Sequence, residues 1–132
     1  MIVVDSTVLI DFLIGEERFQ SSAKSLMDID PYWVLPSLWS YELGNTLWKM
    51  ISFKKLSPEI AALLIEQSQA LVYESVESID SLAVLKMAID RSLTFYDASF
   101  VWLAKSRGLS LYTRDQEIIR KSPGIALSTI DL

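Results

Sequence analysis

The residues best suited to chemistry in this 132-residue chain are acidic, and two of them belong to one stretch, Thr94–Asp115. Asp97 falls three residues after Thr94, where a carboxylate suits both a capping box and the positive end of a helix dipole. Gly108 then offers the left-handed conformation that ends many helices. Asp115 follows a short apolar strand, and open α/β sheets bind ligands at the carboxyl ends of their strands. Asp97 and Asp115 are therefore candidate site residues.

Two further acids join these candidates. Asp5 ends the β-branched apolar run that opens the chain, which we predict to be a strand. Asp5, like the two acids above, has an alternative role as a helix cap, worth about 0.5–2 kcal/mol. Glu42 lies well inside a predicted helix over 38–54 and is too far from its start to cap it. The alternative for Glu42 is a solvated polar face shared with Asn45 and Lys49, which follow at helical spacing.

Short apolar strands alternate with helices along the chain. We predict strands at 1–4, 33–37, 71–73, 109–112 and 125–128, and helices at 6–14, 16–27, 38–54, 58–70, 78–91, 94–107 and 116–121. Ser57 and Pro58 mark one helix start, while Leu82, Leu85 and Ile89 show helical spacing. Strands separated by such helices pair in parallel through right-handed crossovers. The sequence thus predicts one domain over 1–132, with a three-layer α/β/α fold around a central parallel sheet of four to five strands.

This topology brings the acidic residues to one cleft. The strand ends at Asp5 and Asp115 lie side by side, Asp97 opens a neighbouring helix, and the long helix can present Glu42. Convergent carboxylates repel one another unless a cation neutralises them. Hard cations such as Mg²⁺ or Mn²⁺ bind oxygen ligands and keep several waters, which suits attack of water on a phosphodiester. Such a site needs neither histidine nor cysteine, and the chain contains neither.

The charge balance limits how a nucleic acid can bind. The chain has 12 basic and 17 acidic residues and a net charge of −5, which argues against binding by bulk electrostatics. A nucleic-acid substrate would then depend on metal and on a few cations, among which Lys49, Arg91 and Arg114 are candidates. Without cysteine, a basic leader or an apolar run of membrane length, we expect a cytoplasmic protein that makes no use of a membrane.

The acidic motifs together resemble those of PIN-domain nucleases. Four segments carry the resemblance in the family's order: Val3–Ile10, Pro36–Asn45, Tyr96–Ala104 and Leu111–Asp115. The chain length and motif order are similar to those of VapC-type ribonuclease toxins of toxin–antitoxin pairs. Each motif is weak alone, whereas four in order along almost the whole chain are specific.

The resemblance implies a set of roles. The acidic metal site would consist of Asp5, Glu42, Asp97 and Asp115, with Thr113, Asn45 and Ser6 in supporting positions. The cofactor would be Mg²⁺, with Mn²⁺ as the alternative, and the substrate RNA. The partners would be a cognate antitoxin, whose arginine can compete with metal for the carboxylates, and a second copy of the chain. We interpret Asp11 and Glu16, the other acids near the first motif, as exposed helix residues.

Large aromatic residues are numerous for a chain of this length. Trp39, Trp48, Phe53 and Trp102 suggest that part of this set lies in a dimer or antitoxin interface, with Trp39 and Trp102 the better candidates for the core. Two alternatives to the nuclease hypothesis remain open. One is a non-enzymatic PIN-like binding module whose acids act only as caps. The other is a metal-dependent DNA nuclease or phosphatase that uses the same carboxylate chemistry.

Overall fold

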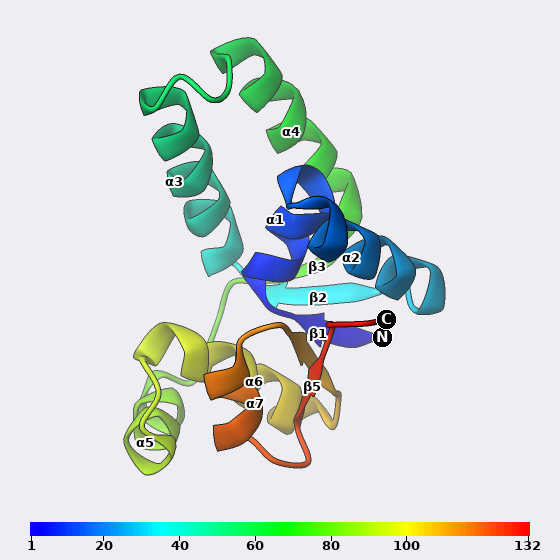
Figure 1. Ribbon diagram of the computed structural model, residues 1–132. Helices are drawn as coiled ribbons and strands as arrows, with labels where there is room; N and C mark the ends of the chain where they lie inside the picture. Colours follow the sequence, from blue (N-terminus) through cyan, green and yellow to red (C-terminus); the bar gives the residue numbers. More distant parts are fainter.

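The computed structural model describes residues 1–132, and a five-stranded parallel sheet forms its centre (Figure 1). The strands are β1 (Ile2–Val4), β2 (Trp33–Pro36), β3 (Val72–Val76), β4 (Leu111–Thr113) and β5 (Ala126–Ser128). Their order across the sheet is β3-β2-β1-β4-β5. Every neighbouring pair is parallel, so the predicted sheet is confirmed.

Helices cover both faces of the sheet. They are α1 (Ser6–Ile14), α2 (Glu17–Ile29), α3 (Leu38–Ser52), α4 (Pro58–Leu71), α5 (Ser81–Arg91), α6 (Phe95–Arg107) and α7 (Gln116–Lys121). Figure 1 shows α1 to α4 on one side of the sheet and α5 to α7 on the other, with α3 and α4 extending away from it as a long hairpin. Because right-handed crossovers that move in opposite directions across a sheet place their helices on opposite faces, the strand order explains these layers. None of the helices combines the length and the apolar character needed to cross a membrane.

The chain changes direction across the sheet between β1 and β4. Val3 pairs with Leu111 and Val4 with Tyr112, and the backbone N–H of Asp5 donates to the carbonyl oxygen of Tyr112 at 3.0 Å. Strand β1 leads to β2 on one side, whereas β4 lies on its other side. The carboxyl ends of β1 and β4 therefore flank a topological switch point, the position at which open α/β sheets bind ligands.

The core lies on both faces of the central strands. Strands β1 and β2 are buried along their whole length, and Trp33 and Phe100 are the largest side chains with almost no exposure. The ring of Trp33 meets that of Phe12 edge-on, with 6.0 Å between centroids. Trp39 is buried in this core and Trp102 packs partly buried against it, as the sequence favoured. These contacts fix the strand ends from which the site is built.

Several predicted helix boundaries are confirmed by the cap geometry. The hydroxyl of Ser57 accepts a hydrogen bond from the N–H of Ile60 at 3.2 Å, and that of Thr94 accepts one from Asp97 at 3.1 Å. Gly108 ends α6 with a φ of 65°, the left-handed conformation that glycine adopts without strain. Local sequence signals thus set the ends of α4 and α6.

Helix α5 begins later than predicted. Ser78 was the expected cap, but the helix begins at Ser81, because the Asp80 carboxylate accepts a hydrogen bond from the N–H of Ala83 at 3.1 Å and caps the helix instead.

Strand β3 is longer than the predicted 71–73, since it pairs with β2 along the whole of β2. Helix α3 ends at Ser52, two residues short of its predicted end.

The apolar residues that marked α5 in the sequence do not face the core. Leu82, Leu85 and Ile89 are 81%, 48% and 70% exposed. The small residues Val84 and Ala88 are buried against α6 instead. Small side chains allow α5 and α6 to approach closely, which leaves an apolar stripe on the outer face of α5.

Gly15 occupies a crowded position directly after α1. A Cβ atom there would lie 2.6 Å from the Cα atom and 2.7 Å from the carbonyl oxygen of Asp11, whereas a Cβ at Gly44 in α3 would have no neighbour within 4 Å. We expect Gly15→Ala to lower the free energy of unfolding by about 1–3 kcal/mol. Gly44→Ala serves as the matched control and should raise that free energy by up to about 1 kcal/mol. Urea denaturation of both variants measures the contrast, and a Gly15→Ala protein as stable as Gly44→Ala would contradict the packing described.

Candidate active site

Asp5 sits at the end of β1 and is buried, with 6% of its surface exposed. The hydroxyl of Thr113 donates to Oδ2 of Asp5 at 2.8 Å, and the same hydroxyl accepts a hydrogen bond from the N–H of Asp115 at 3.0 Å. Asp5 makes no side-chain cap hydrogen bond to α1, so a capping role does not explain it. Thr113 therefore joins the ends of β1 and β4 through the Asp5 carboxylate.

Glu42 reaches the same region from α3. It is half-buried, and the Ser6 hydroxyl in the first turn of α1 donates to its Oε1 at 3.0 Å. The two residues are 36 positions apart in the sequence, and the packing of α1 beside α3 brings them together. Glu42 is thus held at the site rather than lying on a solvated face.

Asp97 lies in the first turn of α6, and Asp115 immediately precedes α7 as its N-cap. Thr94 caps α6 at the N–H of Asp97, but no hydrogen bond returns from the Asp97 carboxylate, so the reciprocal half of the predicted capping box is absent. Asp115 does cap its helix, because its Oδ1 accepts from the N–H groups of Glu117 at 2.9 Å and Ile118 at 3.4 Å. Its Oδ2 has no hydrogen bond. Asp97 and the second oxygen of Asp115 are therefore available to a ligand.

The acidic residues perturb one another. Burial is the main cause that raises the pKa of Asp5 from 3.8 to about 6, and the charges of Glu42 and Asp97 raise it further, against the lowering effect of the Thr113 hydrogen bond. Burial also raises the pKa of Glu42, and the charge of Asp97 adds to that rise. The pKa of Asp97 is raised by burial and then by Asp115. The four carboxyl groups thus form one electrostatically linked cluster whose ionised form is unfavourable without a cation.

This donor set fits a hard divalent cation. All candidate ligands are carboxylate oxygens, and the raised pKa values of Asp5, Glu42 and Asp97 mean that a positive charge at the cluster would be stabilising. No three of the acidic side chains gather closely enough to enclose an ion on their own. Mg²⁺ is commonly held by one or two carboxylates and keeps several waters, so the open arrangement matches the requirements of that ion.

Asp11 corrects one sequence prediction. It was expected to be an exposed helix residue, but it is buried, with 4% exposure, and forms a two-pronged ion pair with Arg114 at 2.6 Å and 3.2 Å. The guanidinium group of Arg114 also lies over the ring of Phe19, 4.3 Å from its centroid. Arg114, a candidate for substrate binding, is thus paired with a buried carboxylate. Glu16 is exposed as expected, immediately before α2.

The sequence carries one signal for this ion pair. Asp11 interrupts the apolar segment 8–14, in which all the remaining residues are hydrophobic. If such a helix is buried, its acid is buried too, and a buried carboxylate needs a partner of opposite charge. The partner, however, is 103 positions away and could not be identified without the fold.

The remaining candidates make no hydrogen bond or ion pair with the four acids. Asn45 and Lys49 are exposed on α3, and neither makes a side-chain hydrogen bond or an ion pair. Arg91 donates a hydrogen bond to the carbonyl oxygen of Lys121 at 3.0 Å, at the opposite end of α7 from Asp115. Thr113 and Ser6 are therefore the predicted supporting residues that the structure brings into hydrogen bonds with the acids.

The comparison of this chain with known protein families agrees with the fold. The family model for the PIN domain matches residues 2–122. The chain belongs to the PIN-domain family. The resemblance seen in the motifs is thereby confirmed.

Two relatives of this chain are named as VapC proteins. The chain is 36% identical over 84 residues to Exonuclease VapC9 of Pyrobaculum aerophilum, a match that spans 64% of this chain and 62% of that relative's length. It is 27% identical over 128 residues to Ribonuclease VapC3 of the same organism, spanning 94% of this chain and 96% of the relative. These matches place the chain among VapC homologues.

Solved structures match the whole fold. The crystal structure of PAE2754 from Pyrobaculum aerophilum superimposes with a TM-score of 0.77 at 28% identity and covers 96% of this chain and 89% of its own. A chain of a toxin–antitoxin complex from Klebsiella pneumoniae superimposes with a TM-score of 0.70 at 17% identity, and both chains are fully covered. At this level of identity the match shows a shared fold. The three-layer PIN architecture is therefore confirmed.

Proposed function

We propose that this PIN-domain protein is a divalent-metal-dependent endoribonuclease and the toxin of a toxin–antitoxin pair. The observation that carries the proposal is the linked cluster of Asp5, Glu42, Asp97 and Asp115 at the switch point of the sheet. Capping alone does not account for it, because the Asp5 side chain makes no cap hydrogen bond to α1 and Glu42 is inside a helix. VapC relatives named as nucleases support the reaction class.

The cluster of four acids would supply one or two carboxylate ligands to Mg²⁺, or to Mn²⁺ in its place, with water as the remaining ligands. A bound cation of this kind supplies a Lewis acid that acidifies water and offsets negative charge on a phosphodiester. Thr113 orients Asp5 by donating to Oδ2, which leaves Oδ1 for the cation, and Ser6 orients Glu42 in the same way through Oε1. Because the pKa of Asp5 is about 6, binding of a cation below that pH is expected to release a proton from this carboxyl group.

The substrate class is tested with matched single-stranded RNA and DNA oligonucleotides. In Mn²⁺ or Mg²⁺ the protein should cut RNA internally, and EDTA should reduce cleavage to background because the carboxylates alone provide no electrophile. Gel analysis of end-labelled substrates measures both. Faster cutting of DNA would favour the DNA nuclease alternative. A protein that cuts neither substrate in any divalent metal would be a binding module.

The exposed apolar residues are the proposed partner surfaces. On the α3–α4 hairpin, Trp48 is 63%, Phe53 73% and Leu63 60% exposed, and we assign this surface to an amphipathic helix of the antitoxin. The outer stripe of α5, with Leu82 and Ile89, is assigned to a second copy of the chain. Large exposed apolar side chains of this kind are typical of interfaces.

Paired substitutions separate the two surfaces. Leu82→Ser with Ile89→Ser should convert a dimer to a monomer in light scattering, since both side chains are exposed and contribute little to the fold. Trp48→Ser with Phe53→Ser should leave the dimer intact and weaken binding of the cognate antitoxin by about 100-fold. Retention of the dimer by the α5 variant, or of full antitoxin affinity by the hairpin variant, would contradict the corresponding assignment.

A further inference from the structure

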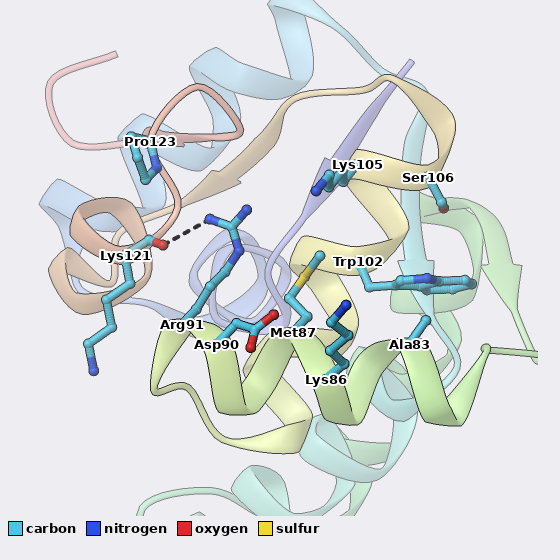
Figure 2. Close-up of a pocket in the computed structure, with 10 residues that line it drawn as sticks. All are labelled: Ala83, Lys86, Met87, Asp90, Arg91, Trp102, Lys105, Ser106, Lys121 and Pro123. Atoms are coloured by element: carbon cyan, nitrogen blue, oxygen red, sulfur yellow. Dashed lines mark hydrogen bonds between the residues drawn. The ribbon is translucent and has the colours of Figure 1, made fainter.

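A second concave region lies away from the acidic cluster, between α5, α6 and the end of α7 (Figure 2). Its volume is about 930 Å³, within the range of cavities that hold small organic ligands. Four basic residues and a single acid, Asp90, line it: Lys86, Arg91, Lys105 and Lys121. A concentration of positive charge in a chain of net charge −5 identifies the cavity as a candidate anion site.

Three of these cations are available to a ligand. Lys86 in α5 and Lys105 in α6 are exposed, and neither takes part in an ion pair or a side-chain hydrogen bond. Arg91 uses Nη1 to donate to the carbonyl oxygen of Lys121 at 3.0 Å, and its other N–H groups have no partner. Figure 2 shows the Arg91 side chain rising from α5 toward α7. Lys121 is already engaged, because its Nζ contacts the Ser92 carbonyl oxygen at 2.7 Å and Glu117 at 2.6 Å.

One wall of the cavity is aromatic. Trp102 of α6 is half-buried, and its ring lies over Ala83 of α5 (Figure 2). Its indole N–H makes no hydrogen bond in the protein. A flat aromatic surface beside cations is the arrangement with which proteins hold single-stranded nucleic acid, because bases stack on the ring while phosphates meet the positive charges. A simple anion such as sulfate would make no use of the indole.

The cavity is connected to the acidic cluster by two helices. Helix α6 carries Asp97 in its first turn and Lys105 in its last, and eight residues of helix span about 12 Å. Helix α7 likewise begins after Asp115 and ends at Lys121. A single strand of a few nucleotides covers such a distance. A strand cut at the acids can therefore reach the cavity with a neighbouring nucleotide.

We propose that this cavity binds one nucleotide of the RNA strand, a few positions from the bond that is cut, with its phosphate on Lys86, Arg91 and Lys105 and its base against Trp102. The inference rests on the proposed nuclease function and adds a site that binds substrate without taking part in the chemistry. Helix-terminal cations also favour the helix dipole, but that role requires neither a cavity nor an aromatic wall.

The test compares cleavage of a long and a short RNA. A 12-nucleotide RNA reaches the cavity from the acids, whereas a dinucleotide does not. For Lys86→Gln with Lys105→Gln we expect kcat/KM on the long RNA to fall about 10-fold more than on the dinucleotide, with a shallower dependence on salt. Lys24→Gln with Lys55→Gln removes the same charge from exposed sites elsewhere and should change the ratio by less than twofold. Trp102→Leu should lower the ratio and Trp102→Phe should largely retain it, with thermal melts confirming that both proteins are folded.

The outcomes are distinguishable from failure of the nuclease proposal. If wild-type protein cuts neither RNA, the proposed function fails. If wild-type protein cuts both RNAs, and Lys86→Gln with Lys105→Gln changes the ratio of the two kcat/KM values no more than Lys24→Gln with Lys55→Gln does, the nuclease proposal stands and the cavity assignment is wrong. Binding of AMP to Asp5→Asn protein, measured by calorimetry, identifies the source of the nucleotide. If AMP binds saturably and the binding is lost when Lys86→Gln and Lys105→Gln are added, free nucleotides also occupy the cavity. If the 12-nucleotide RNA binds and AMP does not, the RNA strand is the ligand of the cavity.

Discussion

Replacing Asp5 by Asn is expected to reduce nuclease activity on the order of 10³-fold while making the metal-free protein more stable at neutral pH. The activity falls because Asn carries no charge with which to hold a cation at the end of β1. The stability rises because a buried ionised carboxylate, repelled by Glu42 and Asp97, is removed. A pKa raised from 3.8 to about 6 corresponds to about 1–3 kcal/mol at pH 7.5, or a rise in Tm of roughly 4–10 °C.

The effect on stability has a defined pH dependence. Between pH 4 and 6 folded Asp5 keeps its proton whereas unfolded Asp5 loses it, so the stability of the wild-type protein falls as the pH rises through this window and then levels off. Asp5→Asn should lack that part of the fall, and thermal melts in EDTA at several pH values measure it. Glu16→Gln, which removes an exposed acid near the same motif, is the control and should alter neither activity nor pH dependence. Full activity of Asp5→Asn would exclude the assigned site.

Replacing Arg114 by Ala is expected to cost about 2–4 kcal/mol of unfolding free energy. The substitution leaves the carboxylate of Asp11, whose side chain is 6% exposed, without its two-pronged partner, and it removes the contact with Phe19 at 4.3 Å. Activity should also fall, because Arg114 lies between Thr113 and Asp115 and fixes the segment that carries both. Chemical denaturation and RNA cleavage report the two effects separately.

A matched control exists for Arg114. Arg18 also lies over Phe19, at 5.6 Å, but its side chain is 65% exposed and its ion pair with Asp131 is at 3.9 Å. Arg18→Ala should change stability by no more than about 0.5 kcal/mol. The double variant Asp11→Ala with Arg114→Ala should lose less than the sum of the single variants, since it leaves no buried charge. Additive losses would show that the buried ion pair contributes nothing specific.

The sequence by itself determined the local features of this protein. Cap residues such as Ser57 and Thr94 and the left-handed Gly108 act on their own helix ends, so their effects were readable from neighbouring positions. The alternation of strands and helices predicted the parallel sheet. The motifs that contain Asp5, Glu42, Asp97 and Asp115 identified the family because their types and order are properties of the chain alone.

Only the tertiary structure decided which side chains meet. Thr113 and Asp5 are 108 positions apart and Arg114 and Asp11 are 103 apart, and both contacts depend on the register of β4 beside β1. The same holds for α5, where the close approach of α6 selects Val84 rather than Leu82 for burial. Burial and ion pairing arise from the packing of segments distant in the sequence. The exposed face of α5, the paired Arg114 and the basic cavity are therefore consequences of packing that no local pattern encodes.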